Sequence, residues 1–183
     1  MAKLNSNKYI ILGLLSQSSK SGYEIKKVID ENFNFYWKIG YNQIYPYLQD
    51  LKYSGLVKVN NKKSDKGPNQ NIYILTDKGL EIFLNWLNTE IKKWPTFKNE
   101  VLVKLNFGSI LDKNENIKLI EDYKKVITKR LNIIKTIQLN IQKYWKNHEN
   151  FIFWDMIIDY GINISLAELN WCKKSIKRIE GCL

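Results

Sequence analysis

Near the start of the chain, hydrophobic residues recur every three or four positions, which is the spacing of helices that bury one face. An apolar run at residues 10–15 is the first such segment, and a second follows Ser21, a residue type that caps helix N-termini. A third segment lies between Gly40 and Gly55, and glycine is typical just beyond a helix C-terminus. The pattern therefore predicts three short helices in succession.

Alternating and β-branched hydrophobic residues replace the helical spacing after the third segment. Residues 56–60 and 71–76 are typical of strands, and the polar stretch at residues 61–70 between them predicts a hairpin with a long tip. Helical spacing returns over residues 77–93, and Pro95 should end this helix because proline disfavours helical geometry in the residue before it. Three helices, a hairpin and a linking helix are the element order of a winged helix-turn-helix.

The second half of the chain is helical in pattern. Segments at residues 97–108, 114–147 and 151–179 are the predicted helices, and the two long ones carry apolar stripes with helical steps. The last helix has a second apolar row beside its stripe, so one neighbouring helix cannot cover all of it. We expect part of it to contact another subunit. The stripe residues predicted to take part in dimerisation are Ile158, Ile162, Leu169, Cys172 and Ile176.

The composition is that of a folded protein with a basic surface. The 183 residues are 44% hydrophobic, and the formal net charge is +11 at pH 7. Such a charge fits a nucleic-acid partner, yet a solvated basic surface explains it equally well on charge alone. Arg130 and Arg178 are the only arginines, so lysine is the only basic side chain of the predicted winged helix-turn-helix.

Side chains of the kind that enzymes and metal sites require are sparse. His148 is the single histidine and fits a polar loop, while Cys172 fits a helical core and Cys182 lies in the tail. No carboxylate pair has a spacing that suggests acid–base work, and no glycine-rich phosphate loop occurs. We therefore expect a protein that is not an enzyme and needs no metal or cofactor.

The N-terminal apolar run is unsuited to a membrane. Residues 9–15 are interrupted by Gly13 and followed by Ser16, which is neither the pattern of a signal peptide nor that of a membrane span. The two cysteines have no disulfide spacing. These features predict a cytoplasmic protein with no membrane partner.

Several spaced motifs lie in the first half: "ILGLL" (10–14), "SGYEIKK" (21–27), Trp37, "YNQIYPYLQDLKYSGLV" (41–57) and "YILTDKGLEIFLNWL" (73–87). Together they cover most of residues 8–88 and resemble the PadR-like transcriptional regulators. The resemblance implies a sequence-specific DNA-binding regulator, usually a repressor, and the longer members of the family add a helical dimerisation half.

The pattern and the resemblance agree on one architecture. The fold is expected to be mainly α with a small β-hairpin wing. Residues 1–93 would form a winged helix-turn-helix domain that includes the linking helix. Residues 94–183 would form an all-helical dimerisation domain, so the protein is expected to be a homodimer.

In such a protein the third helix enters the major groove of double-stranded DNA, and the hairpin tip contacts the backbone. Asn42 and Gln43 can each bond adenine, which predicts A·T contacts in an inverted-repeat operator. Alternatively, Gln43 braces the preceding helix and DNA shape supplies the specificity. The candidate DNA-binding residues are Tyr23, Tyr41, Asn42, Gln43, Tyr45, Lys62, Lys63 and Lys66.

Two departures from the family pattern bear on these contacts. Gly40 stands where the family usually has serine, and residues 69–71 are Asn-Gln-Asn where it often has Arg-Lys. The lysines of the wing lie upstream of that position and either contact phosphates or are solvated. With Asn42 as the helix cap, Pro46 would lie near the first turn, where a missing N–H costs least; the alternative is a kink.

Regulators that resemble this chain often sense planar or lipophilic compounds through aromatic side chains. Trp86, Trp94 and Trp154 are the candidates for such an effector site, although core packing also explains an aromatic-rich composition. A regulator without an effector stays an alternative. So does a second class of function, a basic protein that coats nucleic acid without sequence preference through counterion release.

Overall fold

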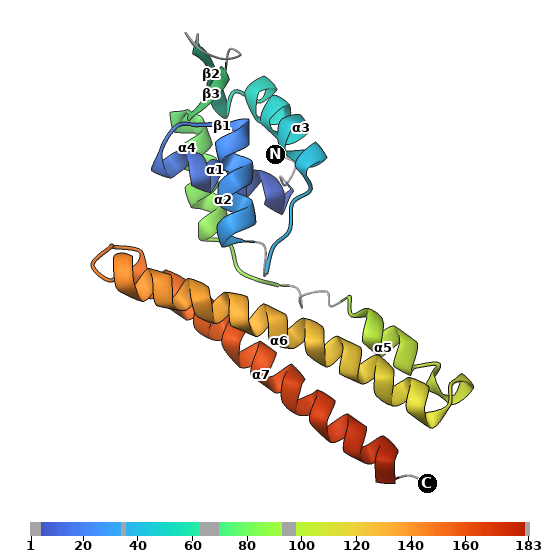
Figure 1. Ribbon diagram of the computed structural model, residues 1–183. Coiled ribbons are helices and arrows are strands. Elements are labelled where there is room, and N and C mark those ends of the chain that lie inside the picture. The colour runs from blue at the N-terminus through green and yellow to red at the C-terminus, as the bar shows by residue number, and fades with distance from the viewer. Residues whose placement is uncertain (1–4, 34–35, 63–69, 93–97, 182–183) are drawn as a thin grey trace. The chain divides into compact units, whose positions relative to one another are not determined.

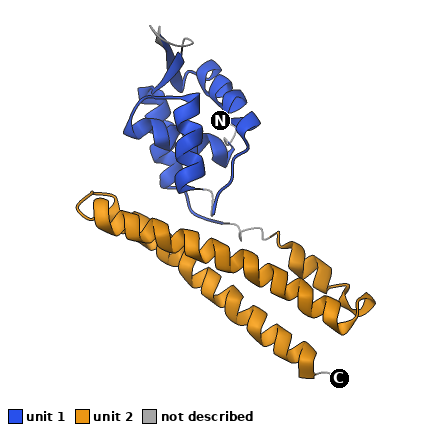
Figure 2. Cartoon of the chain, viewed as in Figure 1, with its two compact units in different colours: residues 1–93 blue, residues 94–183 orange. Residues whose placement is uncertain are grey.

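The computed structural model describes residues 5–33, 36–62, 70–92 and 98–181. The chain forms two compact units, Met1–Lys93 and Trp94–Leu183, which Figure 2 colours separately. The first unit combines helices with a small sheet, and the second is helical (Figure 1). The expected fold class, mainly α with a small β wing, is confirmed.

Side-chain caps begin the first two helices. α1 (Ser6–Gln17) follows Asn5, whose side chain accepts a hydrogen bond from a backbone N–H two residues on, at 3.0 Å. α2 (Gly22–Asn32) follows Ser21, which forms a reciprocal pair with Glu24: each side chain accepts from the backbone N–H of the other. The cap at Ser21 is therefore confirmed. α1 begins earlier than the apolar run because its first turn is polar.

α3 (Tyr41–Tyr53) ends in a Schellman motif. Gly55 has a φ of +71°, and its N–H donates to the carbonyl of Lys52 at 2.9 Å. The N–H of Leu56 donates to the carbonyl of Leu51, also at 2.9 Å. Leu51 and Leu56 are both buried, which supplies the hydrophobic contact that accompanies this ending. The expected glycine at the end of the third helix is confirmed.

The sheet has one more strand than the sequence predicted. β2 (Val57–Lys62) and β3 (Gln70–Leu75) pair antiparallel as the predicted hairpin, with Val57 opposite Leu75. β1 (Lys20–Ser21) pairs with the other edge of β3, so the strand order is β1–β3–β2. Two residues are too few to show a strand period, which is why the pattern missed β1.

α4 (Asp77–Leu87) packs directly against the base of the wing. It begins after Thr76, whose Oγ1 accepts from Gly79 N at 3.1 Å. A Cβ at Gly79 would lie 2.2 Å from the carbonyl oxygen of Leu56, so only glycine permits this approach. The fully buried residues of this unit include Ile11, Leu12, Ile25, Ile29, Ile39, Ile44, Leu48, Leu51 and Tyr73.

The end of α4 differs from the prediction. The helix ends at Leu87 rather than near residue 93, and the Asn88 side chain donates to the carbonyl of Leu84 at 2.9 Å. A short polar side chain that bonds one of the last carbonyls competes with continuation of the helix. Pro95, the expected cause, lies outside the residues described.

The second unit is a long helical hairpin with a short helix beside it. It contains α5 (Glu100–Leu105), a 3-10 turn (Gly108–Ile110), α6 (Lys113–Tyr144) and α7 (Phe151–Gly181). α6 and α7 run antiparallel, and α5 packs against α6 (Figure 1). Both long helices lie within a few residues of their predicted bounds. The buried residues along this hairpin are Ile120, Ile127, Leu131, Ile134, Ile158, Gly161, Ser165 and Cys172.

A polar network crosses the seam between α6 and α7. The Tyr123 hydroxyl donates to Glu168 Oε1 at 2.7 Å and accepts from Asn99 Nδ2 at 2.8 Å. Arg130 pairs with the other carboxylate oxygen of Glu168, and its Nε donates to Ser165 Oγ at 3.2 Å. These directional bonds join α5, α6 and α7 at one level, so they fix the register of α7 against α6.

Tyr123 makes the second unit sensitive to high pH. Burial, and then the hydrogen bond to Glu168, raises the pKa of Tyr123 from 10.0 to about 12. Folding therefore favours the protonated hydroxyl: this stabilisation is complete below about pH 10 and is lost as the pH rises through about 12. Tyr123→Phe should lose less unfolding free energy than the wild type between about pH 9 and about pH 11.5, as measured by urea titration.

The control for this comparison is Tyr144→Phe, at an exposed tyrosine of the same helix. It should show the pH dependence of the wild type. Equal losses in the wild type and Tyr123→Phe would contradict the prediction.

Candidate nucleic-acid interface

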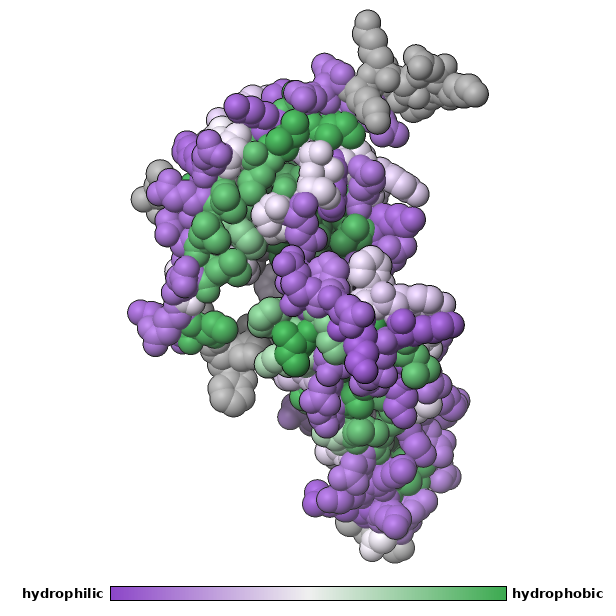
Figure 3. Space-filling model, turned by 90° about the vertical axis from the view of Figure 1, so that its left-hand side faces the viewer, coloured by the Kyte–Doolittle hydropathy of each residue, from purple (hydrophilic) through white to green (hydrophobic). Residues whose placement is uncertain are grey.

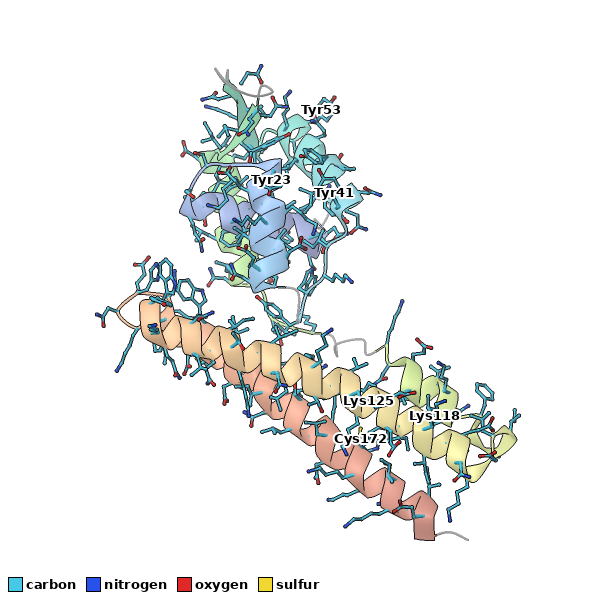
Figure 4. The ribbon with its side chains drawn as sticks, in the orientation of Figure 1. Tyr23, Tyr41, Tyr53, Lys118, Lys125 and Cys172 are labelled. Atoms are coloured by element: carbon cyan, nitrogen blue, oxygen red, sulfur yellow. The ribbon has the colours of Figure 1, made fainter. Side chains whose placement is uncertain are left out.

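α3 buries one face and exposes the opposite one. Asn42, Gln49 and Tyr53 follow one another at spacings of seven and four residues, so they lie on one outward face, and all three are exposed. Tyr53 exposes 85% of its surface at the end of α3 nearest the wing (Figure 4). The predicted buried stripe is confirmed, and its residues are Ile44, Leu48 and Leu51.

The N-terminus of α3 is capped differently from the prediction. The N-cap is Gly40 rather than Asn42, and Gln43 Oε1 accepts a hydrogen bond from the N–H of Gly40 at 3.3 Å. The Gln43 side chain thus braces the start of its own helix. Pro46 lies inside the helix, beyond the first turn, where it removes one helical hydrogen bond.

Tyrosines line the flank of α3 that meets α2. The rings of Tyr41 and Tyr45 pack edge to face with their centroids 5.9 Å apart, and the hydrogen bond with Tyr41 is the main cause that raises the pKa of Tyr45. Tyr45 lies over Gly22, where a Cβ would be 2.8 Å from its ring. Tyr23 follows in α2 and is exposed (Figure 4). Such exposed hydroxyls are suited to donate hydrogen bonds to phosphate.

Of the three wing lysines predicted from the sequence to bind DNA, only Lys62 lies within the described residues. Lys62 is the last residue of β2 and lies opposite Gln70 in the register of the hairpin. Lys63 and Lys66 belong to residues 63–69, outside the described part of the chain. Phosphate contacts by these lysines therefore stay a prediction.

Two of the three tryptophans proposed for an effector site already have aromatic partners. Trp86 on α4 stacks on Tyr9 of α1, with ring centroids 4.7 Å apart. Trp154 on α7 stacks on His148, with centroids 4.6 Å apart, so His148 is part of an aromatic contact that the loop interpretation did not foresee. Trp86 and Trp154 belong to different compact units, and Trp94 lies outside the residues described.

The apolar stripe of α7 packs within the single chain. Ile158 and Cys172 are buried within the single chain, and burial raises the pKa of the Cys172 thiol. Ile162, Leu169 and Ile176 are half-buried. The sequence-predicted dimerisation residues therefore lie in or beside the seam with α6.

Hydrophobic side chains are also exposed on both units (Figure 3). On α4 they include Leu80, Leu84 and Leu87. On α7 they form what we call the outer face of α7, a set at helical spacing away from the seam; its residues are Ile152, Phe153, Met156, Ile157 and Tyr160.

Gln49 and Tyr53 are not among the residues that the sequence predicted to bind DNA. The signal was present, since Gln49 lies seven residues after Asn42 and Tyr53 four residues later, which places all three on one face of a helix. The predicted contacts were confined to the first turn and therefore did not include the rest of this face. Conversely, the cap hydrogen bond of Gln43 could be seen only once the helix start was known.

Other kinds of site find no support in the described residues. Within them, no group of three or more His, Cys, Asp or Glu side chains is placed to hold a metal ion. Of the helices that the structure describes, none has both the length and the apolar character needed to cross a membrane.

Three helices followed by a β-hairpin, with a polar outward face on the third helix, define a DNA-binding protein of the winged helix-turn-helix class. Residues 11–83 match the transcriptional regulator PadR-like family, and residues 97–180 match the virulence activator alpha C-terminal family. The negative transcriptional regulator PadR of Bacillus subtilis is 30% identical over 146 residues, which are 80% of this chain and 79% of that protein. The chain belongs to the PadR-like family of transcriptional regulators.

Solved structures of Bacillus subtilis PadR have the same fold. The structure in complex with operator DNA gives a TM-score of 0.85 at 23% identity, over 96% of this chain and 99% of that one. The structure in complex with p-coumaric acid gives a TM-score of 0.81 at 24% identity, with the same coverage of both chains. The winged helix followed by a helical half is thereby confirmed.

Proposed function

We propose that the chain is a homodimeric, sequence-specific repressor that releases its operator when a small aromatic compound binds. The observation that carries the proposal is the outward face of α3, where Asn42, Gln49 and Tyr53 are exposed beside the β2–β3 wing. A relative named as a negative regulator, with structures in complex with operator DNA and with p-coumaric acid, supports it. Such a protein acts in the cytoplasm, where it reaches the DNA.

The chemistry of this face favours A·T base pairs. Asn42 and Gln49 each offer a donor and an acceptor, which match N6 and N7 of adenine in the major groove. Guanine is most often bonded by arginine, and no arginine precedes Arg130 in the sequence. Residues seven apart lie about 10 Å apart along a helix, so the two amides would contact different base pairs.

Residues on either side of the outward face of α3 would contact the phosphate backbone of the DNA. Tyr23, Tyr41 and Tyr45 supply hydroxyls on one flank, and the wing lysines supply positive charge at the end of β2 and after it. Contacts of this kind set orientation and affinity without reading sequence. The proposed wing residues remain Lys62, Lys63 and Lys66.

The outer face of α7 is the surface proposed to meet a second chain. Met156 exposes 63% of its surface, and Phe153 and Tyr160 are similarly exposed on the same face. A contiguous apolar face of this kind is stabilised when a partner excludes water from it. A two-fold dimer would carry two copies of α3 to half-sites about 34 Å apart, which requires an inverted-repeat operator.

An aromatic effector would use existing ring stacks. Trp86 has Tyr9 and Phe83 as aromatic neighbours, and Trp154 has His148 and Trp145, so a planar compound would add to a stack or replace one of its members. Trp94 stays a proposed third member. The p-coumaric acid bound to Bacillus subtilis PadR is a compound of this class.

The test of the proposed function is whether the protein selects a sequence. Wild-type protein should enrich an inverted-repeat duplex from a random pool and bind it several hundred-fold or more tightly than a scrambled duplex at moderate salt, on the order expected for specific binding. A non-specific coating protein would bind both alike, with an affinity set by salt. Equal affinity would therefore exclude the repressor.

Single substitutions on α3 should distinguish residues that contact bases from residues that only stabilise the helix. Asn42→Ala and Gln49→Ala should each weaken the selected duplex by about 1–3 kcal/mol and the scrambled duplex little. Asn85→Ala, an exposed amide on α4, is the control and should change neither. If Gln43 serves only the stability of α3, Gln43→Ala should weaken both duplexes alike; a loss confined to the selected duplex would show that it contributes to readout, by base contact or by positioning α3. Fluorescence anisotropy titrations measure each value.

A charge on the outer face of α7 should separate the two chains. Met156→Asp leaves the seam with α6 untouched, so the chain should stay folded while light scattering reports a monomer. The carboxylate would have to be buried without a partner in the dimer, which costs several kcal/mol. Asn132→Asp adds the same charge at an exposed position of α6 and should remain dimeric. A dimeric Met156→Asp would place the interface elsewhere.

A further inference from the structure

The first turn of α1 contacts α3 and the segment that leads into it. Asn7 uses both ends of its side-chain amide: Nδ2 donates to the Tyr47 hydroxyl at 3.0 Å, and Oδ1 accepts from Trp37 Nε1 at 2.8 Å. Beside it, Lys8 Nζ lies 2.9 Å from the carboxylate of Asp50. Tyr47 and Asp50 belong to α3, and Trp37 precedes it. The first turn of α1 thus contacts two residues of α3 and one residue of the segment before it.

The opposite flank of α3 is held by α2. Tyr45 lies over Gly22, where even a Cβ would be 2.8 Å from the tyrosine ring. Tyr45 and Tyr47 are two residues apart in a helix, so they point to opposite sides of it. α3 is therefore held between α2 on one flank and the first turn of α1 on the other.

The buried stripe alone does not set the direction in which the outward face points. Hydrophobic contact is non-directional, so it tolerates a small rotation of α3 about its axis. A rotation of about 10° moves a side chain at the helix surface by about 1 Å. Hydrogen bonds to base edges need both distance and angle, so a shift of that size breaks them. The hydrogen bonds of Asn7 are directional and oppose such a rotation.

We propose that Asn7 is a positioning residue for sequence readout: without touching DNA, it fixes the rotation of α3 and thereby the direction of Asn42, Gln49 and Tyr53. This inference rests on the proposed function, because it concerns how that function reads sequence. Contacts with phosphate tolerate small displacements better than contacts with base edges. Loss of the Asn7 bonds should therefore lower specificity more than total affinity.

The test uses the full-length protein with two probes, the duplex that the wild type selects from a random pool and a scrambled duplex of the same length. Asn7→Leu keeps the size of the side chain and removes both hydrogen bonds. It should weaken the selected duplex about tenfold, or 1.4 kcal/mol, and the scrambled duplex less than about twofold. Asn88→Leu removes one side-chain hydrogen bond of 2.9 Å at the end of α4 and should leave both affinities unchanged.

A second variant shows whether Asn7 acts through α3. Tyr47→Phe removes one of its two partners, and the double variant should lose less than the sum of the single losses because the residues act as a unit. Affinities are measured below the unfolding temperature of every variant, so that a difference in folded fraction does not enter.

The outcomes separate this inference from the function on which it rests. If the wild type selects no duplex, the proposed function fails and the inference fails with it. If the wild type selects one and Asn7→Leu keeps the wild-type ratio of affinities, the inference alone is overturned. Equal weakening of both duplexes also overturns it, because Asn7 would then serve stability only.

Discussion

Burial of one face of α3 is the constraint on which the candidate interface depends. Ile44, Leu48 and Leu51 are fully buried, and burying three such side chains contributes several kcal/mol, comparable with the net stability of a small domain. The helix therefore turns this face to the core, and the opposite face, with its amides and a tyrosine, is left to solvent. Its Schellman ending at Gly55 then turns the chain directly into β2, so only residues 54–56 separate α3 from the β2–β3 hairpin.

Local pattern was enough for most elements of the first unit. The stripe of α3, the cap at Ser21 and the glycine after α3 each depend on residues within one or two turns, which is the range over which sequence pattern carries information. β1 and the true end of α4 did not follow, because the first is two residues long and the second was assigned to a proline rather than to Asn88. Short elements and competing caps are decided by packing and by single hydrogen bonds.

The candidate site was less accessible from sequence than the fold. The bonds of Asn7 reach Trp37 and Tyr47, which are 30 and 40 residues away along the chain, so no local pattern reports them. The same limit applies to Gln43, whose part in the cap depends on where the helix begins. Gln49 and Tyr53 could have been found, because they need only the helical period counted from Asn42.

The second unit shows where periodicity stops being informative. α7 carries two apolar rows with the same helical period, so spacing predicts that both are covered but not which one the chain covers itself. The structure buries Ile158, Ser165 and Cys172 of the first row against α6, whereas Trp154, Ile164 and Trp171 of the second row are half-buried. The bonds of Arg130 and Tyr123 to Glu168 explain the choice, since only one rotation of α7 brings Glu168 to both. Polar groups thus decide the orientation of a helix whose hydrophobic surface allows two.

The close approach at Gly79 has a mechanical consequence. Next to it, Thr76 Oγ1 donates to the carbonyl of Gly55 and Lys78 Nζ donates to the carbonyl of Ser54, both at 2.9 Å. The start of α4 is therefore hydrogen-bonded to backbone atoms at the junction of α3 and β2. No layer of side chains separates the two backbones at Gly79. Tightly packed contacts of this kind transmit displacement instead of absorbing it. A displacement of α4 would therefore be passed to α3 and to the β2–β3 hairpin together.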